Sequence, residues 1–182
     1  MGMAAPVYYS AEMVRALPED GNRYETVHGE LLVTPAPRPW HQEVVDRLRD
    51  RLKAYLTGNP GWHVWSAPAD ISWTPDVLVQ PDLFVVPIEE ARTLDWARLR
   101  NLELVVEVLS SGTSRADRFT KRRLYQEVGV PSYWIVDPDR HLVEVWTPAA
   151  SLPTVEREQV VWAPKGARDP MVLNVPEVFR PL

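Results

Sequence analysis

Runs of apolar residues divide the chain into segments of helix and strand length. The sequence of residues 23–33 predicts a β-hairpin that turns at His28-Gly29. Residues 40–57 place their apolar side chains on one helical face, and Gly58-Asn59-Pro60-Gly61 ends that segment. The first third of the chain therefore predicts a hairpin followed by one long amphipathic helix.

Strand-length apolar runs dominate the rest of the chain. Two of them, residues 76–86 and 102–109, are apolar at most positions, which is typical of strands buried on both faces within an α/β sheet. A polar and partly helical connection, residues 87–101, is expected between them. The other predicted strands lie at about 62–66, 133–137 and 142–146, with weaker signals near 155–162 and 171–175.

One more helix is predicted from Ser114 to about Val128. Ser114 and Asp117 have the spacing of a capping box, with Asp in place of Glu, and Gly129 closes the segment. The order of elements is then helix, three strands, helix and strand, with additional β structure at both ends of the chain. This order indicates an α/β (α+β) fold.

Length and composition are those of one globular domain. We expect a single domain over residues 1–182, with an N-terminal extension (1–22), a core (23–146) and a C-terminal β extension (147–182). The chain has no cysteine, which excludes disulfides, thiolate zinc sites and cysteine nucleophiles. It also lacks a signal peptide and an apolar run long enough to span a membrane, so we expect a cytoplasmic protein without a membrane partner.

The formal net charge of −5 argues against a protein that coats nucleic acid through bulk charge. It leaves room for a local basic groove. Arg115, Arg118, Arg122 and Arg123 form a basic patch on the second predicted helix. Such a patch is usually a solvated face, and here it is also a candidate for contact with phosphates.

Two carboxylates interrupt the most apolar runs. Asp82 follows Pro81 in one predicted strand, and Glu107 lies in the next. An unpartnered carboxylate in a buried strand costs several kcal/mol, so both need partners or a metal. Each alone is explained by backbone hydrogen bonds or a structural arginine. Together on neighbouring strands they repel unless a cation lies between them, which predicts a divalent-metal site.

A lysine on the second helix strengthens this prediction. Lys121 is expected to point toward the sheet, where two carboxylates are its natural partners. The alternatives are a lysine that reaches past apolar surface to solvent, or a structural ion pair. The helical stripe that carries Lys121 consists of Ser114, Asp117, Lys121, Leu124, Tyr125 and Val128.

Two other residues are weaker candidates. His41 extends the inward stripe of the first helix, although a histidine at a helix start is more often a capping or core residue. Asp70 precedes the Asp82 strand and is equally well explained by turn chemistry beside a proline. The four histidines have no metal-ligand spacing, and no nucleotide-binding glycine loop or serine-hydrolase motif occurs. A two-carboxylate glycosidase would leave the inward lysine unexplained.

The order of elements and acids resembles the PD-(D/E)xK nuclease superfamily, and more specifically the Uma-two family of restriction endonuclease-like proteins. The resemblance covers about residues 8–178. Its motifs are Gly29-Glu30-Leu31, His41, Ala67-Pro68-Ala69-Asp70, Val79-Gln80-Pro81-Asp82, Val106-Glu107-Val108-Leu109-Ser110, Asp117 with Lys121 and Tyr125, and residues 129–137.

The resemblance implies a restriction-endonuclease-like core, αβββαβ with a mixed central sheet, and a Mg²⁺-dependent endonuclease acting on DNA, with Mn²⁺ as a substitute. Asp82, Glu107 and the Val108 carbonyl would bind the metal, and Lys121 would assist catalysis. His41, Asp70, Asp117 and Tyr125 would line the site, while Arg115, Arg118 and Arg122 would contact nucleic acid.

One position departs from the superfamily pattern. The lysine expected two residues after the acid is Leu109 here, so Lys121 would have to reach the same space. A homodimer is expected from the function and the family, because a duplex presents two strands to cut. The alternatives are a catalytically idle nuclease-fold protein with an interaction or regulatory role, and a nuclease that acts on RNA.

Overall fold

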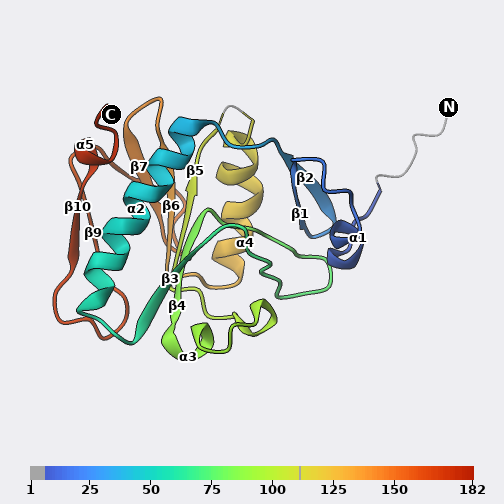
Figure 1. The fold of residues 1–182 in the computed structure, drawn as a ribbon, viewed down its shortest axis with the longest axis horizontal. Coiled ribbons are helices and arrows are strands. Elements are labelled where there is room, and N and C mark those ends of the chain that lie inside the picture. The colour runs from blue at the N-terminus through green and yellow to red at the C-terminus, as the bar shows by residue number, and fades with distance from the viewer. Residues whose placement is uncertain (1–6, 111) are drawn as a thin grey trace.

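A six-stranded mixed β-sheet lies between helices on both of its faces (Figure 1). The computed structural model describes residues 7–110 and 112–182, so residues 1–6 of the expected N-terminal extension and Ser111 lie outside it. The strands follow the order β3-β4-β5-β6-β7-β8, in which only β5 and β6 run parallel. The mixed sheet and the order helix, three strands, helix and strand confirm the predicted fold class.

Most of the predicted elements are present, with bounds close to the predicted ones. The helical elements are α1 (Ala11–Arg15), α2 (Pro39–Thr57), α3 (Ile88–Ala91), η1 (Trp96–Arg98), the π-helical segment η2 (Ala116–Lys121), α4 (Arg122–Glu127) and α5 (Val175–Val178). The strands are β1 (Arg23–Val27), β2 (Glu30–Thr34), β3 (Trp62–Ser66), β4 (Leu83–Pro87), β5 (Leu104–Val108), β6 (Ser132–Asp137), β7 (Leu142–Trp146), β8 (Thr154–Glu156), β9 (Gln159–Trp162) and β10 (Met171–Asn174).

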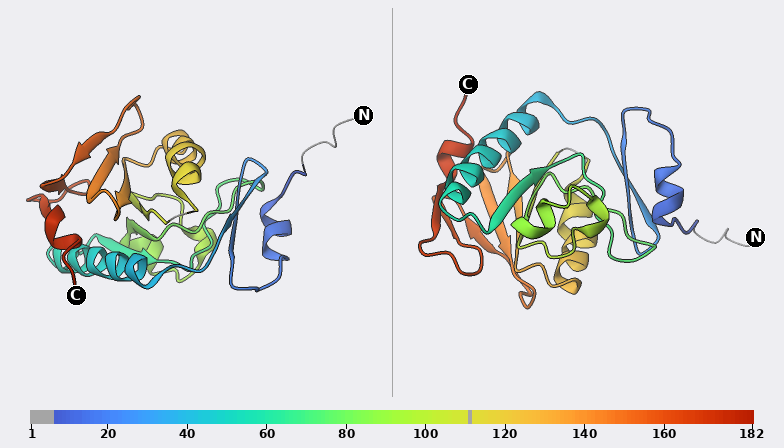
Figure 2. Two further views of the ribbon diagram at one scale, coloured as in Figure 1. Left: turned by 90° about the horizontal axis from the view of Figure 1, so that it is seen from above. Right: turned by 60° about the horizontal axis from the view of Figure 1, so that its bottom comes forward.

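Alternate residues of the central strands supply two hydrophobic layers. On β5, Val106 and Val108 pack with the apolar face of α2 and with β9 and β10. Val105 and Leu109 point the other way and pack with Leu124 and Tyr125 of α4. The side-chain period of a strand therefore sends Glu107, which lies between Val106 and Val108, toward the η2–α4 helix. Figure 2 shows α2 and η2–α4 on opposite sides of the sheet.

The N-terminal hairpin β1–β2 forms a separate two-stranded sheet beside the central one (Figure 1). It turns at His28 and Gly29, whose φ values of 49° and 83° are both positive, as a type I′ turn requires. Tyr9 donates a backbone hydrogen bond to the Gly29 carbonyl, and Thr26 pairs with Leu78 in an isolated bridge. The hairpin is thereby attached to the loop that precedes β4.

The strand predicted over residues 76–86 is shorter than expected. Strand β4 begins only at Leu83, and Asp82 lies directly before it rather than inside it. Leu78 and Val79 form isolated bridges with Thr26 and Ile71. Because Pro81 has no N–H to donate to a ladder, continuous pairing does not extend upstream through this position.

The predicted capping box on the second helix is wrong. Helical structure does begin at Ser114, but the Ser114 hydroxyl accepts a hydrogen bond from the Arg118 guanidinium. The Asp117 N–H donates instead to the Thr113 carbonyl. Ser114 is itself helical and does not precede the helix as a cap, and its hydroxyl has the charged guanidinium as a partner. In the described part of the chain, no helix has the length and hydropathy needed to cross a membrane.

We expect Gly29→Ala to destabilise the protein by about 2 kcal/mol, because Gly29 combines a positive φ with a close approach to Tyr8. A Cβ at this position would lie 2.2 Å from the Tyr8 ring. Thermal unfolding followed by circular dichroism measures the change. Gly61→Ala is the matched control, because a Cβ there meets nothing within 4 Å. Equal melting temperatures for the two variants would contradict this account of the turn.

Candidate active site

Asp82 and Glu107 lie opposite one another where β4 meets β5. Leu83 pairs with Val106 in the antiparallel ladder, and the next step of the same register sets Asp82 beside Glu107. Their exposed fractions are 4% and 1%. The Val108 N–H donates to Asp82 Oδ2 at 2.8 Å, which joins the loop before β4 to the end of β5. The sheet therefore presents two buried carboxylates side by side.

Asp82 is held by two further contacts, which come from two other elements. Arg23 of β1 donates from Nη1 to Oδ1 at 2.9 Å, and His41 Nε2 of α2 lies 3.2 Å from Oδ2. Burial disfavours ionisation of Asp82, but the His41 hydrogen bond, the Arg23 charge and the Val108 N–H outweigh it. The pKa of Asp82 consequently lies well below its usual range, and the carboxylate stays ionised.

Glu107 is held from the opposite side by the η2–α4 helix. Lys121 Nζ donates to Glu107 Oε1 at 3.0 Å, and the Tyr125 hydroxyl donates to the same oxygen at 3.1 Å. Burial raises the pKa of Glu107 well above its usual value, although Lys121 opposes that shift. Nearby Asp82, Asp117 and Glu25 raise the Glu107 pKa further. The two carboxylates of the pair thus have opposite pKa shifts.

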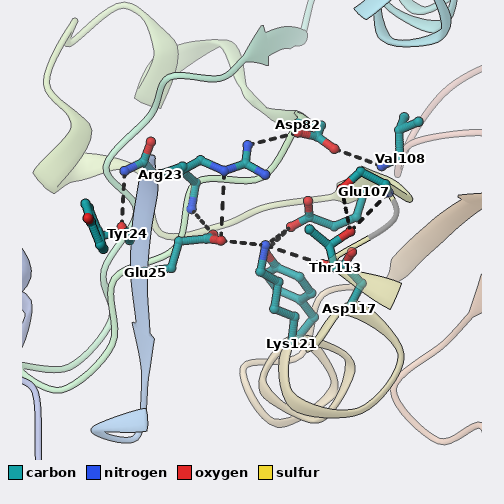
Figure 3. A network of polar contacts seen from close by, with 12 residues as sticks. Arg23, Tyr24, Glu25, Asp82, Glu107, Val108, Thr113, Asp117 and Lys121 are labelled. Atoms are coloured by element: carbon teal, nitrogen blue, oxygen red, sulfur yellow. Dashed lines mark hydrogen bonds and ion pairs between the residues drawn. The ribbon is translucent and has the colours of Figure 1, made fainter. Parts of the chain in front are cut away.

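Lys121 is the centre of the buried network (Figure 3). Besides Glu107, its Nζ lies 2.9 Å from Glu25 Oε2 and 3.5 Å from Asp117 Oδ1. Among the residues that the structure describes, neither of these two oxygens has a partner with hydrogen-bond geometry, so their attraction to Lys121 is mainly electrostatic. Burial alone would lower the pKa of Lys121, but the carboxylates outweigh it and raise that pKa above its ordinary value. Lys121 therefore carries its charge at every physiological pH.

The network contains more negative than positive groups. In the part of the chain that the structure describes, the permanent cations paired with Glu25, Asp82, Glu107 and Asp117 are Arg23 and Lys121, so the formal balance is four acids to two cations. In residues 7–110 and 112–182, no three His, Asp or Glu side chains are arranged to hold a metal ion. Mg²⁺, however, is commonly bound by one or two carboxylates and keeps several waters. The hard oxygen donors and the missing positive charge both fit such a cation.

A cleft of about 720 Å³ reaches one end of the network. Arg23, His41 and Asp82 line it, together with the start of α2 and residues 66–70. A smaller opening of about 240 Å³ lies at the other end, beside Glu25, Asp117 and Lys121. Asp82 thus faces the large cleft, whereas Lys121 lies behind Glu107 as seen from that side.

The structure brings most of the predicted site residues together. Asp82, Glu107 and Lys121 share one network, and His41, Asp117 and Tyr125 contact it directly. Asp70 lines the same cleft but pairs with Arg15 at 2.9 Å. The Val108 N–H is bound to Asp82, and its carbonyl remains a predicted ligand only.

The arginines of the predicted basic patch differ in their partners and in their exposure to solvent. Arg118 lies within 2.9 Å of both Asp137 and Glu144, and Arg122 stacks on Trp146 with 4.7 Å between guanidinium carbon and ring centre. Arg115 is exposed beside the smaller opening. Arg118 and Arg122 already have protein partners, so Arg115 is the member of the predicted contact set whose side chain is most open to a ligand.

Sequence reasoning missed two residues of the network, Arg23 and Glu25. They lie two apart on β1 and so point to the same face of the hairpin. Charged residues on a strand usually indicate a solvated face. The available signal was a pair of opposite charges followed directly by Thr26 and Val27, in a strand whose side chains are otherwise suited to burial.

We expect the metal-free protein to lose stability as the pH rises from about 5 to 8. The raised pKa values of Glu107 and Asp117 mean that the folded state binds more protons than the unfolded state. This stabilisation is fully present below the unfolded pKa, about 4.5 for Glu107 and about 3.8 for Asp117. It is lost as the pH rises through the folded pKa of each group, by roughly 1.4 kcal/mol for each pH unit between its folded and unfolded pKa values.

Glu107→Gln should flatten this dependence, since it removes one of the two titrating groups. Urea unfolding in EDTA across the pH range measures the slope. Glu89→Gln is the control, because that side chain is 78% exposed. Parallel curves for the wild type and Glu107→Gln would show that Glu107 is ionised in the folded protein throughout.

We expect Lys121→Met to destabilise the protein by about 3–5 kcal/mol at pH 8, because it leaves buried carboxylates without their cation. The loss should be smaller at pH 5, where those carboxylates take up protons. Denaturant unfolding at both pH values makes the comparison, with the exposed Lys53→Met as the matched variant. A loss no larger than that of Lys53→Met would mean that Lys121 does not hold the network together.

Comparisons with known proteins agree with this architecture. The crystal structure of "a putative nuclease belonging to DUF820 from Anabaena variabilis ATCC 29413" superimposes with a TM-score of 0.76 at 20% sequence identity. The match covers 94% of this chain and 97% of that one, and at this identity it shows the shared fold. No curated protein matches the sequence. The model of the Uma2 (Uma-two) family, described as "Putative restriction endonuclease", matches residues 11–175, and the chain belongs to this family.

Proposed function

We propose that this protein is a metal-dependent nuclease that hydrolyses phosphodiester bonds, with DNA as its substrate. The observation that carries the proposal is the meeting of Asp82, Glu107 and Lys121 in one buried network that opens on a cleft. Membership of a family described as "Putative restriction endonuclease" and the fold of the similar nuclease support the same class of activity.

In this proposal Asp82 and Glu107 hold Mg²⁺, with the Val108 carbonyl as a further ligand and Mn²⁺ as a substitute. The bound ion would polarise the scissile phosphate and lower the pKa of the attacking water. The four acids have too few cations around them, and a divalent cation here would supply the missing positive charge. A proton on Glu107, whose pKa is raised, is the alternative way to reduce the negative charge.

The side chains around the pair fix its geometry. The Val108 N–H and His41 orient Asp82 and keep it ionised, so that it is ready to act as a ligand. Lys121 and Tyr125 hold one oxygen of Glu107 and leave its other oxygen free of these two contacts. The permanent charge of Lys121 also favours negative charge developing on a phosphate nearby. These residues would therefore position the two metal ligands, and Lys121 would act on the phosphate through its charge.

The finer parts of the proposal concern the substrate and the assembly. A homodimer would offer one cleft to each strand of a duplex, and a cytoplasmic enzyme would meet DNA directly. Arg115 would contact the phosphate backbone outside the site, and Arg118 and Arg122 lie on the same helical segment.

One observation favours a second candidate, a catalytically idle nuclease-fold protein. Arg23, His41 and the Val108 N–H already bind both oxygens of Asp82, and Lys121 already neutralises Glu107. Both carboxylates of the pair thus have protein partners without a metal. Such a protein would keep the fold for interaction with a partner.

Incubation with supercoiled plasmid, single-stranded DNA and RNA in Mg²⁺ or Mn²⁺ tests the proposal. We expect cleavage of DNA that EDTA abolishes and that Asp82→Asn and Glu107→Gln each reduce by at least about 100-fold, because each removes a metal ligand. Surface variant Glu89→Gln should keep full activity.

Three outcomes would change the proposal. Cleavage that survives both ligand substitutions would assign the activity to another site or a contaminant. Faster cleavage of RNA than of DNA would favour the RNA-directed alternative. Absence of cleavage of every substrate, in protein that unfolds at its normal temperature, would favour the idle candidate.

A further inference from the structure

We propose that Arg23 is a phosphate-binding residue held in reserve on Asp82. When a divalent cation binds Asp82, the guanidinium leaves that carboxylate and binds a phosphodiester of the substrate in the cleft. This inference rests on the proposed function and adds to it a residue that recognises the substrate. It also makes metal binding and substrate binding depend on each other.

The contact between Arg23 and Asp82 uses few of the hydrogen-bond donors of the guanidinium. It consists of one hydrogen bond, from Nη1 to Oδ1 at 2.9 Å. In the described part of the chain, the buried Nε of Arg23 has no hydrogen-bond partner, and its nearest carboxylate oxygen, Glu25 Oε2, is 4.0 Å away. A guanidinium normally binds a carboxylate or phosphate through two parallel N–H groups. Arg23 therefore keeps donors for a second, better-matched anion.

The location of Arg23 suits such an anion. Its side chain is 21% exposed and lines the large cleft together with Asp82 and His41. Lys121, the other permanent cation of the network, has only 2% of its side chain exposed and does not line that cleft. A phosphate that enters the cleft thus reaches Arg23 directly, whereas Lys121 stays behind Glu107.

The two oxygens of Asp82 have different partners, which makes an exchange possible. Oδ2 accepts from the Val108 N–H and contacts His41, so the protein scaffold holds this oxygen. Among the described residues, Arg23 alone binds Oδ1. A cation that binds Oδ1 needs only the Arg23 side chain to move, while the β4–β5 junction stays as it is.

Charge supports the same exchange. With four acids and two permanent cations, the network gains balance from a divalent ion at Asp82 and Glu107. The ion then repels the neighbouring guanidinium, and the single negative charge of a phosphodiester attracts it. By thermodynamic linkage, if the ion raises the affinity for the phosphodiester by some factor, the phosphodiester raises the affinity for the ion by the same factor.

Binding measurements test the exchange without any reaction. Mn²⁺ is titrated into the purified full chain and followed by electron paramagnetic resonance, with and without a thymidine dinucleotide whose one linkage is a hydrolysis-resistant phosphorothioate. In the wild type, we expect the dinucleotide to tighten Mn²⁺ binding by about tenfold, and Mn²⁺ to tighten dinucleotide binding equally.

Arg23→Gln should bind Mn²⁺ alone about tenfold more tightly than the wild type, because the competing cation is gone, and the dinucleotide should no longer affect Mn²⁺ affinity. Arg23→Lys should keep the competition but lose most of the coupling, since an ammonium cannot bind a phosphate through a planar fork. If Arg23→Gln does not fold, as judged by circular dichroism, the Arg23→Lys result decides by itself.

Arg15→Gln is the matched control, because Arg15 lines the same cleft but pairs with Asp70. It should leave both Mn²⁺ affinity and coupling unchanged. The exchange would be overturned if the wild type binds Mn²⁺ and Arg23→Gln either binds it with the same affinity or keeps the coupling. The proposed nuclease site would then remain intact. Absence of Mn²⁺ binding in every variant, with or without the dinucleotide, would overturn both the exchange and the proposed metal site.

Discussion

The need to neutralise buried carboxylates is the constraint on which the rest of this structure depends. Lys121 Nζ lies within 3.5 Å of Glu25, Glu107 and Asp117, which come from the N-terminal hairpin, the central sheet and the π-helical segment. Because a buried charge without a partner is far more costly than a paired one, these three elements cannot separate without a large penalty. The hairpin is thus part of the site and not merely an addition to the sheet.

The network has a protected end and an accessible end. Lys121, Glu107 and Tyr125 form the protected end, where each side chain is almost fully buried against the apolar layer between sheet and helix and the smaller opening lies beside Lys121. Asp82, Arg23 and His41 form the accessible end, which faces the large cleft. This division suits a site in which one group of residues fixes the geometry and another meets the ligand. The π-helical turn that carries Asp117 and Lys121 is itself a feature often found at functional sites.

Much of the fold could be predicted from local sequence, since strands and helices bury their apolar residues with different periods. Strand β3 coincides with its prediction, and α2 differs by one residue at its start. The start of β4 and the cap of the second helix were predicted wrongly, because a backbone or side-chain feature outweighed the pattern of apolar and polar residues. Pro81 shortened β4, and the Arg118 guanidinium took the Ser114 hydroxyl that was expected to cap the helix.

The candidate site divides in the same way. The sequence by itself determined that Asp82, Glu107 and Lys121 are candidates, because a charge inside an apolar run or on an apolar helical stripe conflicts with its surroundings and so can be recognised locally. Only the tertiary structure decided that Arg23 and Glu25 complete the network. Arg23 is 59 residues from Asp82 in the chain, and a charge on a hairpin strand conflicts with nothing nearby in sequence. Its burial follows from where the hairpin packs, which local periodicity does not contain.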